Sequence, residues 1–185
     1  MTKFIGNCNH IIDWNSVLQD VSNTTPAYSG PIHRIDDKVE GVCEIGVSWY
    51  IGGYTNAAEG GVAGWDMYHA GKQFDMMIVD QFAEYVKMDI VLETWISRIL
   101  PGKMAPWHWD TNDKNVEYDS MNKLVRFSCH VSPPTPGHVF IIEDDCYYNQ
   151  AQGNTYQWPS RRSWHAGANF GVTPKYLFNI FGIVK

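Results

Sequence analysis

Two histidines and one aspartate in the second half of the chain carry the side chains of a metal site. His108 and Asp110 stand in the segment Pro-Trp-His-Trp-Asp, and His165 follows much later in Ser-Trp-His-Ala-Gly. Two imidazoles and one carboxylate are the ligands of the facial triad that holds Fe(II) and leaves coordination positions open for substrate and O2. We therefore interpret His108, Asp110 and His165 as metal ligands and as the catalytic centre.

Strand geometry accounts for the His-x-Asp spacing. On a β-strand, residues i and i+2 point to the same face, about 6.6 Å apart at roughly 3.3 Å per residue. Side chains leaning inward from His108 and Asp110 can then share one ion, and we expect His165 on another strand of the same sheet, in a His-Ala-Gly turn. The alternative is two surface histidines and a helix-capping aspartate, because His-x-Asp also occurs by chance.

The first half of the chain contains the helical patterns. We expect a short helix at 13–21 and a longer one at 72–88, where apolar residues recur at three- and four-residue intervals. Between them lie a loop-rich stretch at 23–42, a strand-like segment at 44–54 and a glycine-rich loop at 60–64. That loop lacks the lysine of a phosphate cradle, so we interpret it as a surface segment.

The second half is strand-like. Alternation in one segment places Arg126 and His130 on one face and Phe127 and Cys129 on the other. Helices first and short antiparallel strands afterwards predict an α+β, mainly β fold, with helices that brace a jelly-roll core. We expect the strands at 90–100, 123–132, 139–144, 154–158 and 175–184.

Composition narrows the classes of partner. A chain of 185 residues with 44% hydrophobic and 14% aromatic content is long and apolar enough to fold as one domain, and we expect a single domain over 1–185. The net charge of −6, without a Lys/Arg cluster, makes a nucleic-acid backbone an unexpected partner.

Nothing in the sequence predicts a membrane or an oxidising compartment. The chain begins without the apolar run of a signal peptide, and no segment has the length of a membrane span. The four cysteines Cys8, Cys43, Cys129 and Cys146 form no C-x-x-C pair. We expect reduced thiols in a cytoplasmic protein, with Cys129 as a small core residue.

From Ile90 to the C-terminus, the chain resembles the Fe(II)/2-oxoglutarate-dependent oxygenases, in particular the aspartyl/asparaginyl β-hydroxylase type. His108, Asp110 and His165 match the His-x-Asp…His signature of that family. The resemblance implies a double-stranded β-helix at 90–185, on which a helical and loop-rich part at 1–89 packs. It also implies Fe(II) and 2-oxoglutarate as cofactors. The implied activity is O2-dependent hydroxylation, coupled to decarboxylation of 2-oxoglutarate to succinate.

The same resemblance implies the cosubstrate site. The family places a basic residue about ten positions after the distal histidine to bind the distal carboxylate of 2-oxoglutarate, and here that residue is Lys175. A Ser-x-x-x-Pro-Gly segment assigns Ser97 to the same carboxylate. An Arg-x-x-x-His pair, used around cosubstrate and substrate, corresponds to Arg126 and His130.

Two departures from the family pattern affect these expectations. The family usually has arginine at the Lys175 position, and lysine keeps the charge but loses the bidentate fork. The β-hydroxylases nearest in pattern tend to lack the metal carboxylate, whereas this chain has Asp110. A carboxylate there occupies the position that halogenating relatives leave open for chloride, so it favours hydroxylation.

Several alternatives remain open from sequence. Lys175 could be solvated at its strand start, Arg126 could pair with a structural aspartate, and His130 could be a hydrogen-bonded core histidine. The whole chain could be a cupin-like metal protein without 2-oxoglutarate chemistry, or a non-catalytic binding module. The substrate could be a peptide Asp or Asn, a free amino acid, proline or a small metabolite. Any of three tryptophans, Trp107, Trp109 and Trp164, could line the substrate mouth.

Overall fold

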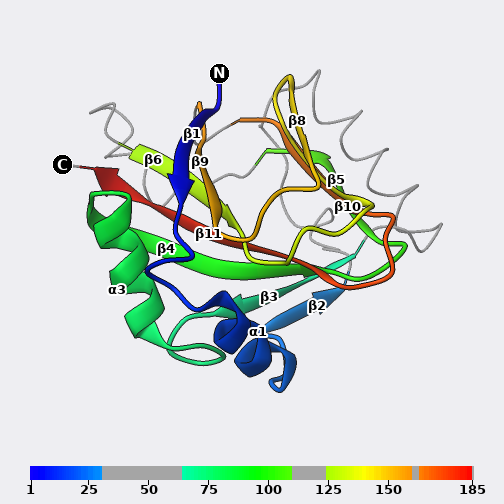
Figure 1. Cartoon of the computed structure of the whole chain (residues 1–185), viewed down its shortest axis with the longest axis horizontal. Helices are drawn as coiled ribbons and strands as arrows, with labels where there is room; N and C mark the ends of the chain where they lie inside the picture. Colours follow the sequence, from blue (N-terminus) through cyan, green and yellow to red (C-terminus); the bar gives the residue numbers. More distant parts are fainter. Residues whose placement is uncertain (31–63, 110–123, 160–162, 185) are drawn as a thin grey trace, which may run out of the picture.

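The structure, a computed structural model, describes residues 1–30, 64–109, 124–159 and 163–184 (Figure 1). Its elements in chain order are β1 (Lys3–Asn7), α1 (Trp14–Ser22), β2 (Tyr28–Gly30), β3 (Trp65–His69), α3 (Met76–Tyr85), β4 (Met88–Ile99), β5 (Met104–His108), β6 (Leu124–His130), β7 (His138–Ile142), β8 (Asp145–Tyr148), β9 (Asn154–Gln157), β10 (His165–Asn169) and β11 (Lys175–Val184).

The strands form two antiparallel sheets. One has seven strands in the order β1-β9-β6-β11-β4-β3-β2, and the other has four in the order β5-β10-β7-β8. The long red strand β11 runs through the centre of the larger sheet, between β4 and β6, and the smaller sheet lies on one side of it (Figure 1). This is the mainly β jelly roll with bracing helices that the sequence predicts.

The two faces of the larger sheet pack against different partners. On one face, Phe178 of β11 contacts Phe82 of α3 and Trp14 of α1, with ring centroids 4.9 and 5.5 Å apart. Figure 1 shows both helices on this side. On the other face, Leu177 packs in a buried cluster with Phe140 of β7. Because side chains alternate along a strand, every second residue of β11 faces the smaller sheet.

Carboxylates at the helix starts determine where the helices begin. The Asp13 carboxylate accepts hydrogen bonds from two backbone N–H groups of α1. The helix α3 begins only at Met76, later than the expected range of 72–88, because Asp75 caps it by accepting from the N–H two residues on. Lys87, with φ of 58°, ends it. Within the residues described here, neither helix is long and apolar enough to cross a membrane.

Strand predictions succeed where alternation is long. β11 begins and ends where the sequence predicts, and β4, β6, β7 and β9 overlap their predicted ranges. The expected His-Ala-Gly turn after His165 is wrong, because these residues pair on both sides as strand β10. The sequence patterns do not predict β1, β3 or β8, and β2 lies within the expected loop at 23–42. The expected strand at 44–54 lies outside the described residues, as does all but the last residue of the glycine-rich loop.

Gly182 provides a test of the pairing between β11 and β4. The register shifts between Phe181 and Gly182. A Cβ at Gly182 would collide with the carbonyl oxygen of Ile90 and lie 2.7 Å from the sulfur of Met88. We expect Gly182→Ala to lower the free energy of unfolding by about 1–3 kcal/mol, the usual cost of overpacking. Urea unfolding measures this, with Gly64→Ala as the control.

Gly64 is a suitable control because the nearest atom to a Cβ there is the Lys103 Cδ, at 3.9 Å. An equal loss of stability in both variants would contradict the close approach of β4 to Gly182.

Candidate functional site

His108 and His165 meet on neighbouring strands of the four-stranded sheet. His108 is the last residue of β5, His165 is the first residue of β10, and the two are direct cross-strand partners. Their ring centroids lie 4.1 Å apart and both residues are buried. The two imidazoles thus come from two strands of one sheet, as the sequence leads us to expect.

Backbone carbonyls orient both imidazole rings. The Nδ1 atom of His108 lies 2.6 Å from the carbonyl oxygen of Pro106, and the Nδ1 atom of His165 lies 3.0 Å from that of Ser163. A carbonyl only accepts, so each Nδ1–H donates, and in the neutral form of each ring the Nε2 carries the lone pair. Metal-binding histidines usually donate their second ring N–H in this way. Both rings therefore have the tautomer that a metal ligand requires.

Two tryptophans that sequence reasoning did not single out pack against these rings. Trp65 of β3 stacks on His108 with an interplanar angle of 17° and a centroid distance of 6.0 Å. Trp158, just after β9, meets His165 edge-on at 4.6 Å. The indole rings thereby restrict the rotation of both imidazoles.

The tryptophans next to the candidate ligands in sequence contact one another. Trp107 and Trp164 stack with centroids 6.2 Å apart, and Trp109 meets Trp164 edge-on at 6.5 Å. All three are partly exposed. They form an aromatic cluster on the β5–β10 pair.

The third expected ligand, Asp110, lies outside the described residues, and the described ones contain no cluster of three or more His, Cys, Asp or Glu side chains suited to a metal. They supply two imidazoles whose Nδ1 atoms face backbone carbonyls. This donor chemistry fits Fe(II), and also Ni(II) or Zn(II).

Lys175 is buried between the two sheets. The residue is 3% exposed, although it opens β11 directly after Pro174. Its ammonium donates a 2.6 Å hydrogen bond to the carbonyl oxygen of Val139 on β7 and lies 5.2 Å from the ring centroid of Phe140. The alternative of a solvated lysine is therefore wrong, and the side chain crosses from the larger sheet to the smaller one.

Gly167 makes room for the ammonium beside the strand of His165. A Cβ at Gly167 would lie 3.2 Å from the Lys175 Nζ and 2.9 Å from the Ile99 Cδ1. Gly167 is two residues from His165 along β10, a separation of about 6.6 Å on a strand. A cationic group and a candidate metal ligand thus lie along the same strand.

Burial lowers the pKa values of two side chains, Lys175 and His130. It lowers the pKa of Lys175 to about 7. Burial, with smaller contributions from Lys175 and His138, lowers the pKa of His130 to about 3, so this imidazole is neutral. Among the described residues, the His130 Nε2 has no hydrogen-bond partner. The alternative that His130 is a core histidine with all its hydrogen bonds made therefore fails at Nε2.

The buried ammonium predicts an unusual pH dependence of stability. Lys175 has a pKa of about 7 in the fold and 10.5 as the ordinary value. Between these pH values the unfolded chain holds the proton more tightly, so the free energy of unfolding should rise with pH, by at most about 1.4 kcal/mol per unit. Urea unfolding of metal-free protein at pH 7, 8 and 9 measures this rise, which should be smaller in Lys175→Met by the contribution of the lysine. If the free energy of unfolding rose equally with pH in the wild type and in Lys175→Met, the burial of the Lys175 charge would be contradicted.

Ser97 belongs to a buried polar network. Its hydroxyl donates to the carbonyl oxygen of Leu177 at 3.3 Å and lies 3.5 Å from the Nδ2 of Asn179. The Asn179 Oδ1 accepts 2.7 Å from the Ser128 hydroxyl, which in turn accepts the indole N–H of Trp158 at 2.8 Å. The network thus connects Ser97 to the tryptophan that meets His165.

Arg126 joins this network from β6. Its guanidinium carbon lies 3.8 Å from the ring centroid of Trp158 and 4.8 Å from that of Trp95, and one of its N–H groups approaches Asn179 Oδ1 at 3.5 Å. The residue is buried. The indole of Trp158 thus contacts both the guanidinium of Arg126 and the imidazole of His165.

One sequence signal could have found the rest of this network. Ser128 stands between Arg126 and His130 at period two, and Asn179 follows Lys175 on the same face of an otherwise apolar strand. Polar residues that recur every second position on a buried face indicate a polar interior.

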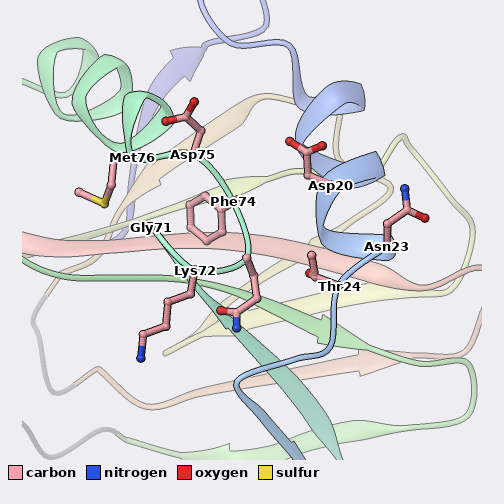
Figure 2. A pocket seen from close by; sticks show the side chains of 9 residues that line it. Asp20, Asn23, Thr24, Gly71, Lys72, Phe74, Asp75 and Met76 are labelled. Carbon is pink, nitrogen blue, oxygen red and sulfur yellow. The ribbon is translucent and has the colours of Figure 1, made fainter.

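A separate hollow lies on the helix side of the molecule. It has a volume of about 510 Å³ and opens between the end of α1 and the start of α3 (Figure 2). Asp20 and Asp75 stand on opposite sides of it (Figure 2), and Phe74 also lines it. None of the candidate site residues lines it, so we do not assign the proposed chemistry to this hollow.

No protein-family model matches the chain, and no curated protein matches it in sequence. Its fold is similar to that of a prolyl hydroxylase from Trichoplax adhaerens, solved with a hypoxia inducible factor oxygen degradation domain peptide. That TM-score is 0.56 at 11% identity, covering 98% of this chain and 83% of that one. A prolyl-4-hydroxylase from Pseudomonas putida is similar with a TM-score of 0.53 at 10% identity, covering 99% of this chain and 91% of that one. At such identities the likeness shows that the chains share a jelly-roll fold.

Proposed function

We propose that the chain is an Fe(II)/2-oxoglutarate-dependent dioxygenase that hydroxylates an amino-acid side chain or a small metabolite. One observation carries the proposal: a buried ammonium, Lys175, lies beside the strand that also bears His165, two residues away along β10. A buried cation is costly unless it meets an anion. A dicarboxylate of the length of 2-oxoglutarate could reach from the imidazole pair to that ammonium.

The roles of the individual residues follow from their surroundings. His108 and His165 would hold Fe(II) through Nε2, with Asp110 as the proposed third ligand. Lys175 would neutralise the distal carboxylate, and we assign His130 to the same end of the site because Lys175 contributes to its lowered pKa. When bound, the metal and 2-oxoglutarate would supply the activation of O2 and the electrons that reduce it.

Other residues would shape and dry the site. Phe140, Trp158 and Leu177 form a buried apolar cluster between the sheets, which excludes water. Arg126 and Ser97 belong to the polar network around Trp158. We propose that this network holds Trp158 against His165, and that Arg126 also contributes to cosubstrate or substrate binding.

The alternative is a cupin-like metal protein without 2-oxoglutarate chemistry, or a non-catalytic binding module. Either would use the two imidazoles but would give the buried ammonium of Lys175 no anionic partner. The cost of burying an unpaired charge makes this alternative less favourable.

Succinate release tests the proposed activity. The protein with Fe(II), 2-oxoglutarate and air should consume 2-oxoglutarate and release succinate slowly even without its true substrate. The His108→Ala protein, purified in the same way, measures contaminating activity. Equal succinate release by the two proteins would remove the support.

The identity of the substrate needs its own assay. Peptide Asp or Asn is one candidate because of the sequence resemblance, and proline is another because the similar solved structures are prolyl hydroxylases. Peptides containing Pro, Asp or Asn, and the free amino acids, can be compared for faster succinate release and for a gain of one oxygen atom in mass. We further propose one domain over 1–185, in which residues 1–89 influence this choice.

A further inference from the structure

Two cysteines meet in the core on the helix side of the larger sheet. The sulfurs of Cys8 and Cys129 lie 3.6 Å apart, although the residues are 121 positions apart in the chain. Both residues are fully buried. They belong to the core cluster that contains Phe82 and Phe178, and not to the cluster around Trp158 between the sheets. The site described above therefore does not use them.

Two groups donate hydrogen bonds to the Cys8 sulfur and stabilise its thiolate, while the neutral thiol donates to the carbonyl oxygen of Gly153 at 3.3 Å. The indole N–H of Trp14 donates to the Cys8 sulfur at 3.3 Å, and the hydroxyl of Thr155 lies 3.7 Å away. The hydrogen bond with Cys129 is the largest cause that lowers the pKa of Cys8 to about 7, with burial opposing it. Burial raises the pKa of Cys129. One sulfur is thus suited to attack an oxidant, and the other remains a thiol beside it.

The backbone around Cys8 holds the sulfur in place next to an exposed stretch of the chain. The Cys8 N–H donates to the carbonyl oxygen of Gly153 at 3.0 Å, which fixes the connection between β1 and α1 against the start of β9. The next two residues, Asn9 and His10, are exposed. A local opening of this connection would expose the Cys8 sulfur without disturbing the sheet.

We propose that Cys8 and Cys129 form an intrachain disulfide when the protein meets hydrogen peroxide. The Cys8 thiolate attacks one peroxide oxygen, the O–O bond breaks, hydroxide leaves, and Cys8 becomes a sulfenic acid. The Cys129 sulfur then gives up its proton and attacks the Cys8 sulfur, and the sulfenic oxygen leaves as water. The thiols together lose two electrons and two protons, and the peroxide is reduced to two waters.

The bond would change the N-terminal connection more than the candidate active site. A disulfide is about 2.05 Å long, so the sulfurs must approach by roughly 1.5 Å. Cys129 is the last but one residue of β6 and pairs with Phe178 of β11 on one side and Thr155 of β9 on the other, whereas Cys8 lies in a connection. The Cys8 side therefore moves. Closing so long a loop restricts the unfolded chain, so oxidation raises the thermal stability.

The test uses the full chain exposed to dilute hydrogen peroxide, then denatured, alkylated and digested without reduction. Mass spectrometry should find the Cys8 peptide joined to the Cys129 peptide, and the melting temperature should rise by several degrees. The exposed Cys146 provides the control: Cys146→Ser keeps the cross-link and the shift, whereas Cys8→Ser and Cys129→Ser lose both.

The peptide map of the wild-type protein decides the matter even if a serine variant fails to fold. The proposal is overturned if Cys8 and Cys129 are both alkylated after a peroxide exposure that oxidises Cys146. It is equally overturned if either forms its disulfide only with Cys43 or Cys146. These outcomes are independent of whether the histidine site binds a metal.

Discussion

Replacing either histidine of the cross-strand pair is expected to abolish metal binding and succinate release. His108→Ala and His165→Ala each remove one of two imidazoles whose rings lie 4.1 Å apart. Loss even of a residue that supports a metal ligand typically costs 10–100-fold in affinity, so loss of a ligand should cost at least about 100-fold. Titration with Co(II), followed by its visible absorption, measures the affinity, and succinate release measures the activity.

His69→Ala is the matched control, because His69 ends β3 and is exposed. It should bind Co(II) as the wild type does. Circular dichroism should show that all three variants are folded. If folded His108→Ala and His165→Ala retained the wild-type Co(II) affinity, the ion would be bound elsewhere and the assignment of this pair would be wrong.

The second large effect is expected at Lys175. Lys175→Met keeps most of the length of the side chain and removes its charge. Removing one partner of a buried charge pair costs 2–5 kcal/mol or more, so the affinity for 2-oxoglutarate should fall on the order of 100-fold. The metal affinity should change little, because the ammonium lies beside Gly167 and not against the imidazoles. Anaerobic titration of the Fe(II) protein with 2-oxoglutarate measures the cosubstrate affinity.

Two further variants make this result specific. Lys175→Arg keeps the charge with a different geometry and should retain part of the binding. Lys72→Met removes an exposed lysine on the helix side and should have no effect. If Lys175→Met bound 2-oxoglutarate as tightly as the wild type, the anchor would have to be another residue, and Arg126 would be the first to test.

Periodicity predicts much of the fold and part of the site. Alternation along 123–132 correctly places Arg126 and His130 on the face opposite Phe127 and Cys129, because successive side chains of a strand point to opposite faces. The long apolar run at 175–184 also predicts correctly where β11 begins and ends. The hypothesis that His108 and His165 bind one ion leads us to expect them on two strands of one sheet, and the structure places them there.

Contacts between distant strands cannot be predicted from periodicity. Pairing on both sides turns the short, small-residue segment after His165 into strand β10, where local preference favours a turn. Trp65 and Trp158 come to the imidazoles from other parts of the chain, so no spacing near the ligands indicates them. Tertiary packing likewise decides that Lys175 is buried.

The appearance of a charge-transfer band under anaerobic conditions tests the central claim most directly. The wild-type protein with Fe(II) alone should show no visible band. Adding 2-oxoglutarate should produce a saturable metal-to-ligand charge-transfer band, which His108→Ala lacks and which Lys175→Met forms only at much higher 2-oxoglutarate concentration. If the wild-type protein binds Fe(II) but 2-oxoglutarate produces no band and does not tighten metal binding, the chain is a jelly-roll metal protein without this cosubstrate, and the proposed function is wrong.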